Sequence, residues 1–359
     1  MTKKEVLRAV VFLLLCFGVF VYLNNVFTIS DSSDSGRMMN SFHSEKKDSL
    51  DGCYLGSSAV YRFWNPARAY NKEGISVFTF ASADQPMVLC PYVIEEIEKT
   101  QDPKVYIIEL RDLIKSADQM EDAAVRRFTD NLSMFSLTRL KAINASIEFA
   151  RKGDNNVDKG RMDHYLPIVK YHTRWDSDDL NTDDLLVKNS ESPTKGFVVG
   201  GQSMTCVPRQ QPDYTEETVS LEPEMEELLD DLMKFCDGLD AQVLYVLSPY
   251  YEDDPKDLRR LNEIERLVEE SGHKILNFNS KEMTEKIGLN WKKDLYDKKH
   301  VNIIGSEKYT DYLAQYLKEA YNLPDHRGDA DYKSWEESYE YYLDYTREAR
   351  ELLVQENKK

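Results

Sequence analysis

The chain has 359 residues, of which 41% are hydrophobic and 31% charged, a composition typical of a folded globular protein. Its formal net charge of −18 argues against a nucleic-acid partner, because binding a phosphate backbone requires a positive surface. The same charge disfavours loose adhesion to anionic polymers or lipids, so an anionic substrate needs a local cluster of basic side chains.

An apolar run near the N-terminus extends from Val6 to Leu23. Its eighteen residues, as a helix, rise ~27 Å, which is enough to cross the hydrocarbon core of a bilayer. Basic residues precede the run or lie at its start, and no Lys or Arg follows it until Arg37. The positive-inside rule therefore places the N-terminus in the cytoplasm and the rest of the chain outside. A cleaved signal peptide is the alternative, but the residues after Leu23 form a poor cleavage site.

Four regions are expected along the chain. Residues 1–29 form the cytoplasmic tip and the transmembrane anchor, and the Ser- and Asp-rich residues 30–49 form a flexible stalk. Residues 50–330 form an α/β domain, and residues 331–359 form a C-terminal helix. Within the domain, residues 152–220 show no clear periodicity, which is typical of a functional loop or a lid.

The α/β domain is predicted from short apolar runs that alternate with amphipathic stretches. The expected strands are 52–56, 75–81, 105–110, 242–248 and 274–277. The expected helices are 88–99, 123–131, 137–151, 222–239, 258–271 and 306–321. This alternation predicts a three-layer α/β sandwich with a mainly parallel five-stranded sheet and helices on both faces. Active sites in such sheets lie beyond the carboxyl ends of the strands.

Two short segments carry residues suited to acyl-ester chemistry. Residues 55–63, LGSSAVYRF, follow the first strand, where a serine at a strand-to-helix turn exposes its hydroxyl. Near the last helix of the domain, Asp297 and His300 are three residues apart, so the carboxylate can fix the tautomer of the imidazole. Asp294 is the alternative carboxylate. The elbow of α/β-hydrolases is excluded, because its G-x-S-x-G motif does not accept Val60.

These two segments resemble the first and last sequence blocks of the SGNH, or GDSL-type, hydrolase superfamily. Gly56-Ser57-Ser58 matches the first block with Ser57 in place of Asp, and the D-x-x-H of residues 297–300 matches the last. By this resemblance Ser58 is the nucleophile, His300 the base and Asp297 its partner, on a sheet of the flavodoxin-like type. The resemblance covers about residues 50–322.

Two other blocks of the superfamily supply a Gly after the second strand and a Gly-x-Asn after the third, which complete the oxyanion hole. Here these places read FASADQ and ELRD, so neither the Gly nor the Asn is present. The backbone N–H of Ser58 remains as one donor. By position, Ser82, Gln85 and Arg111 are the candidates for the second donor or for contact with the substrate.

The irregular region adds two more candidates. His172 and Arg174 lie there beside Trp175, and a guanidinium with an indole suits the recognition of a sugar or a phosphate, although a buried Trp175 that anchors the loop is the alternative. No C-x-x-C or H-x-x-x-H spacing is present, so no metal site is predicted, and the superfamily motif implies no cofactor. The cysteines outside the anchor leave two readings open, disulfides or free buried thiols.

The Gly-Ser-Ser variant behind an anchor looks most like the DltD group, which acts in D-alanylation of teichoic acids. It is also similar to anchored SGNH-like proteins that O-acetylate exopolysaccharides. The expected function is therefore an extracytoplasmic acyltransferase or esterase that acts on a cell-envelope polymer or glycan through a Ser58 acyl-enzyme. A multi-span membrane O-acyltransferase is an implied partner. The alternative is a catalytically degenerate surface protein of the same fold, a binding or assembly module, which the altered middle blocks favour.

Overall fold

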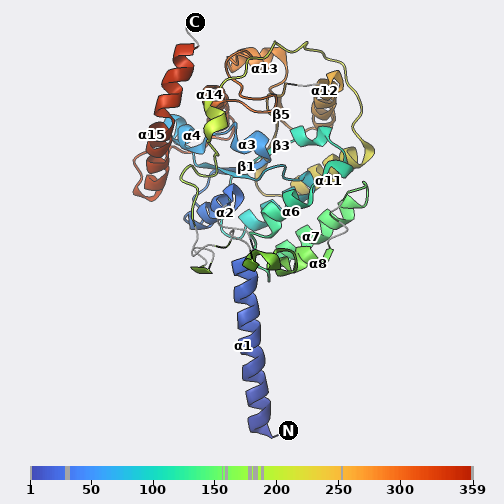
Figure 1. Cartoon of the computed structure of the whole chain (residues 1–359). Helices are drawn as coiled ribbons and strands as arrows, with labels where there is room; N and C mark the ends of the chain where they lie inside the picture. Colours follow the sequence, from blue (N-terminus) through green and yellow to red (C-terminus); the bar gives the residue numbers. More distant parts are fainter. Residues whose placement is uncertain are drawn as a thin grey trace.

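The computed structural model describes residues 2–28, 33–155, 157, 161–176, 180, 185–186, 190–251 and 254–356. In Figure 1 a long helix, α1 (Lys3–Phe27), projects from one end of a mixed α/β domain. Thr2 and Glu5 form a capping box at its start. In the described part of the chain, α1 is the one helix long and apolar enough to cross a membrane, and it contains the predicted apolar run.

Five parallel strands form the centre of the domain, as predicted. They are β1 (Gly52–Gly56), β2 (Val77–Ala81), β3 (Val105–Glu109), β4 (Gln242–Leu247) and β5 (Ile275–Asn277). Their order is β2-β1-β3-β4-β5, and each neighbouring pair is parallel. Each strand lies within its predicted range. The chain leaves β1 towards one edge of the sheet and β3 towards the other, so the carboxyl ends of these two strands are where a ligand is expected to bind.

Alternate strand residues face two separate apolar clusters, so both faces of the sheet are buried. Leu55 and Ile108 belong to one cluster, and Tyr54 and Ile107 to the other. The first cluster includes residues of α5 (Cys90–Ile97), α6 (Asp122–Thr129), α7 (Leu137–Ala150), α11 (Pro223–Cys236) and α12 (Pro255–Glu270). The second includes residues of α4 (Pro66–Glu73) and α14 (Ile303–Ala320).

The six helices predicted for the α/β domain are present as α5, α6, α7, α11, α12 and α14. Each end differs from the predicted one by three residues or fewer. Several short helices were not predicted or lie in the irregular region. They are α3 (Ser58–Tyr61), α8 (Arg161–Tyr165), α9 (Pro167–Tyr171), α13 (Lys281–Lys286) and the 3-10 helix η4 (His172–Asp176). The gaps between the described residues fall mainly in the predicted insertion, 152–220.

The prediction of a flexible stalk at residues 30–49 is wrong for the part that the structure describes. Residues 30–32 lie outside it, and α2 (Asp34–Ser44) forms directly afterwards. Met38 and Phe42, one helical turn apart, are buried against the sheet, and the Phe42 ring meets the Phe80 ring edge-on at 5.0 Å between centroids. The Ser- and Asp-rich composition hid this apolar stripe, which is what fixes the segment to the domain.

The C-terminal helix is α15 (Lys333–Glu356), as predicted. Trp335, Tyr342 and Leu353 of this helix are buried, whereas Leu343 is exposed. In Figure 1 α15 lies beside α4, at the side of the domain.

Candidate active site

The turn after β1 places Ser58 at the carboxyl edge of the sheet, as the first residue of α3. Gly56 precedes it with φ at 150°, and a Cβ there would lie 2.8 Å from the Cβ of Glu109, so this turn requires glycine. Ser57 is the N-cap of α3, since its buried Oγ accepts a hydrogen bond from the N–H of Ala59 at 3.4 Å. The two neighbouring serines therefore have different surroundings, and Ser57 is held by the fold.

Ser58, His300 and Asp297 form one chain of hydrogen bonds. The Oγ of Ser58 lies 2.7 Å from Nε2 of His300. The Nδ1 of His300 lies 2.9 Å from Oδ2 and 3.1 Å from Oδ1 of Asp297. A carboxylate has no proton to donate, so Nδ1 is the donor to Asp297 and Nε2 is left to accept the Ser58 proton. The structure thus brings together the three residues that the sequence predicted as a triad.

Asp294, the alternative carboxylate, has a different role. Its side chain is fully buried, and Oδ2 accepts hydrogen bonds from the N–H of Asn290 and from Nζ of Lys308, both at 2.6 Å. These contacts tie the loop before α14 together. Asp297 is therefore the residue that orients the imidazole, and Asp294 supports the loop that carries it.

The surroundings of His300 favour its neutral form. Burial lowers the pKa of the imidazole, the hydrogen bond with Asp297 raises it, and the nearby guanidinium of Arg111 lowers it again, leaving the pKa below its ordinary value. Burial raises the pKa of the Asp297 carboxyl, but hydrogen bonds from His300 and from two backbone N–H groups outweigh this and lower it. At neutral pH the pair is therefore an imidazole that can accept a proton and a carboxylate that orients it.

A pocket of about 490 Å³ opens beside Ser58. Its lining combines basic, acidic and apolar side chains from the segments that follow β2, β3, β4 and β5. The basic residues that line it are Arg111, Lys115, Arg260 and Lys299, and the acidic ones are Asp84, Asp112, Glu121 and Asp257. Lys115 pairs with Asp84 and Asp112, and Arg260 with Asp257, so the lining is strongly polar but balanced in charge and suits a polar substrate.

Ser82 and Gln85 lie in the loop after β2, in contact with the turn that carries Ser58. The N–H of Ser82 donates to the carbonyl of Gly56 at 3.3 Å, and its Oγ donates to Oε1 of Gln85 at 3.2 Å. Ser82 is therefore committed to the fold. Gln85 lines the pocket together with Ser58. Because its Oε1 already accepts the hydrogen bond from Ser82, its NH2 group is the part that can donate to a ligand.

Arg111 joins the end of β3 to the loop of the triad. Its side chain is buried, and Nη1 donates to Oγ of Ser248 at 3.2 Å and to the carbonyls of Pro249 and Lys299 at 3.0 and 2.9 Å. The last of these bonds fixes the residue that precedes His300. Arg111 also lines the pocket. It therefore positions the triad and contributes positive charge beside it.

Glu109 is a site residue that sequence reasoning did not select. It is fully buried at the end of β3 and accepts hydrogen bonds from the hydroxyl of Tyr54 at 3.0 Å and from the N–H groups of Ser248 and Arg111 at 3.0 and 3.2 Å. Burial raises the pKa of this carboxyl to about 7, against the lowering effect of Arg111. The available signal was a carboxylate at the end of an otherwise apolar strand.

His172 and Arg174 are not among the described residues that line this pocket. Arg174 donates from Nη1 to the carbonyls of Phe27 and Val26, at 2.8 and 3.3 Å, at the end of α1. Nδ1 of His172 lies 2.8 Å from the carbonyl of Val169. Contrary to the expected role in substrate recognition, these residues lie where the domain meets α1.

Among the described residues, no group of three or more His, Cys, Asp or Glu side chains is arranged to hold a metal ion. None of the five cysteines forms a disulfide, and three of them, Cys53, Cys90 and Cys236, are buried. Burial raises the pKa of these three thiols, which keeps them protonated.

No model of a known protein family matches this chain, and no curated protein matches it either. Any functional assignment therefore depends on the residues themselves. The strongest of these observations are the hydrogen-bonded chain of Ser58, His300 and Asp297 and the pocket that opens beside it.

Proposed function

We propose that this protein is an SGNH-type serine acyltransferase or esterase that forms an acyl ester on Ser58. The observation that carries this proposal is the distance of 2.7 Å between Oγ of Ser58 and Nε2 of His300, with Asp297 held at 2.9 Å from the other ring nitrogen. A capping serine has no need of an imidazole that is itself oriented by a carboxylate. Nucleophilic catalysis needs this arrangement.

In the first half-reaction, His300 takes the hydroxyl proton of Ser58 while Oγ bonds to the carbonyl carbon of an acyl ester. The tetrahedral intermediate then breaks its bond to the alcohol oxygen, and His300 returns the proton to that alcohol. In the second half-reaction, a water molecule or another hydroxyl group attacks the Ser58 ester with the same proton transfers in reverse order. Water gives an esterase, and a sugar or polyol hydroxyl gives a transferase.

Two donors suit the negative charge that develops on the carbonyl oxygen. The backbone N–H of Ser58 is at the first position of α3, where a helix supplies no internal acceptor. The amide of Gln85 is the second, and it takes the place of the Asn that the superfamily uses. The hydroxyl of Ser82 orients this amide through its 3.2 Å bond to Oε1.

The fold supports the same assignment. The strand order β2-β1-β3-β4-β5 is that of flavodoxin-like sheets, in which ligands bind outside the carboxyl ends of the strands beside the point where the order reverses. Ser58 follows β1 and Arg111 follows β3, the two strands on either side of that point. We assign the domain to the three-layer sandwich of the SGNH superfamily, as a DltD-like member.

The substrate that we propose is an acylated polymer or glycan of the cell envelope. Helix α1 anchors the domain in the membrane with its N-terminus in the cytoplasm, because basic residues cluster at that end. The lining of the pocket is rich in charged side chains, which suits a polar acyl acceptor better than a lipid tail. A multi-span membrane O-acyltransferase is the proposed source of acyl groups.

Labelling with a fluorophosphonate tests the assignment. The full chain in detergent is treated with the probe beside two variants, Ser58→Ala and Ser57→Ala, which remove the same hydroxyl from neighbouring residues. We expect labelling of wild type and of Ser57→Ala and none of Ser58→Ala. Addition of a polyol to an acetyl ester assay then separates transfer from hydrolysis.

An unlabelled but folded wild type, or equal labelling of Ser58→Ala, would contradict the proposal. The first result would favour a binding module. The observation in the structure that supports a module is that the backbone N–H of Ser82 already donates to the carbonyl of Gly56, so it is not available to an oxyanion.

A further inference from the structure

A group of large apolar side chains is exposed at the end of the domain where α1 emerges. We call Phe135, Leu137, Met162, Val169, Trp175 and Leu186 the apolar collar. Trp175 and Leu137 are the most open, with 71% and 73% of their surface exposed. Water around so many large apolar groups on one face of a domain is unfavourable, and exposed patches of this kind mark interaction surfaces.

The collar lies against the last part of α1. The ring of Phe135 is 5.9 Å from the ring of Phe17, between centroids. The hydroxyl of Tyr22 donates to the carbonyl of Leu185 at 2.9 Å, next to Leu186 in the chain. Helices α9 and η4, which carry Val169 and Trp175, also contact α1. The collar is therefore continuous with the membrane-spanning helix itself, as the junction at the base of the domain in Figure 1 indicates.

The position of the Phe17–Phe135 contact along α1 indicates how deep Phe135 lies in a bilayer. Phe17 precedes Leu23, the last residue of the apolar run, by six residues, which is ~9 Å along a helix. Apolar groups of proteins that lie on membranes enter the boundary between headgroups and acyl chains by ~5–10 Å. When α1 spans a bilayer, Phe135 is therefore at the level of that boundary and not in water.

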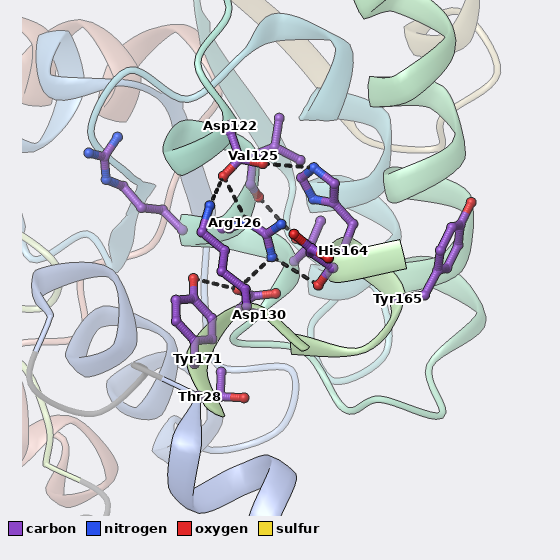
Figure 2. A network of polar contacts seen from close by, with 12 residues as sticks. Thr28, Asp122, Val125, Arg126, Asp130, His164, Tyr165 and Tyr171 are labelled. Atoms are coloured by element: carbon purple, nitrogen blue, oxygen red, sulfur yellow. Dashed lines mark hydrogen bonds and ion pairs between the residues drawn. The ribbon is translucent and has the colours of Figure 1, made fainter. Parts of the chain in front are cut away.

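A partly buried polar network holds one segment of the collar in place. Figure 2 shows Asp122 of α6 beside Arg126 and His164: Arg126 donates to it from Nε at 2.8 Å, and Nε2 of His164 lies 3.0 Å away. The ammonium group of Lys170 also contacts Asp122. Nearby, the hydroxyl of Tyr171 donates to Oδ2 of Asp130 at 3.1 Å.

His164, Lys170 and Tyr171 belong to the segment that carries Met162, Val169 and Trp175. Asp122 and Arg126 belong to α6, which packs on α7 within the domain, and Asp130 is the C-cap of α6. Because these bonds fix the segment to α6, its outward apolar side chains keep their positions and cannot turn inward to find a core.

We infer that the apolar collar is a membrane-docking surface, covered by the interfacial region of the same bilayer that α1 spans. The inference rests on the membrane anchor of the proposed function. It adds that the domain itself contacts the leaflet and is not separated from it by a stalk. Trp175 suits this position, because an indole combines apolar surface with one hydrogen-bond donor and is favoured at the membrane interface.

Tryptophan fluorescence of the full chain in vesicles tests the inference. Trp64, Trp291 and Trp335 are buried, so Trp175 is the tryptophan open to a quencher. The vesicles consist of phosphatidylcholine brominated on its acyl chains near the headgroup. We expect quenching in wild type and its loss in Trp175→Phe. A second reporter, Phe135→Trp in the Trp175→Phe background, restores the quenching.

A matched control uses Leu352→Trp, also in the Trp175→Phe background. Leu352 is exposed to a similar extent, 61%, but lies on α15 away from α1. This reporter is expected to respond to aqueous iodide and not to the brominated lipid.

Quenching of Trp175 by iodide instead of lipid would overturn the inference. Protection from both quenchers would also overturn it, because a second copy of the chain would then cover the collar. Flotation with the vesicles reports insertion of α1, and fluorophosphonate labelling reports Ser58. The three readouts therefore distinguish a collar that does not contact lipid from a helix α1 that does not insert and from a Ser58 that does not react.

Discussion

The Oγ of Ser58 lies 2.7 Å from Nε2 of His300, although 242 positions separate the two residues in the chain. Ser58 lies in the turn after β1, and His300 lies in the loop before α14. Asn302 caps α14 through hydrogen bonds from the N–H groups of Ile304 and Gly305 to its Oδ1, which fixes the end of that loop. The contact therefore depends on two rigid turns at one edge of the sheet.

Ester turnover is expected to fall as the pH decreases through the pKa of His300. Only the neutral imidazole can take the Ser58 proton, and burial, with the charge of Arg111, lowers this pKa below 6.5 despite Asp297. The acid limb of a plot of kcat/KM against pH should therefore lie below 6.5. Asp297→Asn removes the group that fixes the tautomer and should reduce kcat about 10⁴-fold. An acid limb well above the ordinary histidine value would contradict this description of the site.

Gln85→Leu is expected to slow acylation of Ser58 by about 10²- to 10³-fold, which is the usual effect of removing one oxyanion donor. The change keeps the approximate size of the side chain but removes its amide. Gln315→Leu on α14, an exposed position, provides the same substitution away from the site. Rates of fluorophosphonate labelling, measured over time, make the comparison. Equal rates in Gln85→Leu and wild type would exclude this amide as the second donor.

The buried carboxyl of Glu109 should make the protein less stable as the pH rises. Its pKa is about 7 in the folded chain and 4.5 in its ordinary state, so between these values the folded state retains a proton that the unfolded chain releases. The contribution of this proton to the free energy of unfolding is fully present below pH 4.5. It decreases as the pH rises to 7, by about 3 kcal/mol in total. Glu109→Gln should remove this part of the pH dependence.

Thermal unfolding of wild type and Glu109→Gln across that range measures the difference. Glu319→Gln at an exposed position of α14 is the control. A constant gap between wild type and Glu109→Gln at all pH values would show that the carboxyl does not titrate as described.

Phe42→Ala should destabilise the domain by about 3–5 kcal/mol, because it removes a fully buried aromatic ring that packs on Phe78 and Phe80. A residue in a flexible stalk would show no such effect. Arg37→Ala, on the same helix but partly exposed, should change the stability by no more than about 0.5 kcal/mol. Unfolding by urea in detergent gives both free-energy changes. A small effect of Phe42→Ala would support the prediction of a flexible stalk instead.

Much of the architecture could be predicted from local patterns. The buried parallel strands read as short apolar runs, and the amphipathic helices show their period, because burial on both faces of a sheet leaves a clear signal. Ser58, Asp297 and His300 were also predictable, because Gly56-Ser57-Ser58 and the D-x-x-H of residues 297–300 resemble the first and last blocks of a hydrolase superfamily.

The rest depended on contacts between distant segments. The apolar stripe of α2 is short and set among serines, so only the sheet beneath it reveals its role. The same holds for Glu109, whose significance comes from burial beside Tyr54 and Arg111, and for Arg174, which binds the end of α1 and not a ligand. Local sequence has no signal for partners that lie on other elements.

Detection of an acyl-enzyme tests the proposed role of Ser58 most directly. The full chain is incubated with an activated acetyl ester, quenched in acid and digested, and the peptide that contains Ser57 and Ser58 is examined by fragmentation in a mass spectrometer. We expect an acetyl group on Ser58 that hydroxylamine removes, and none in Ser58→Ala or His300→Ala. An acetyl group on Ser57, or equal acetylation in both variants, would contradict it.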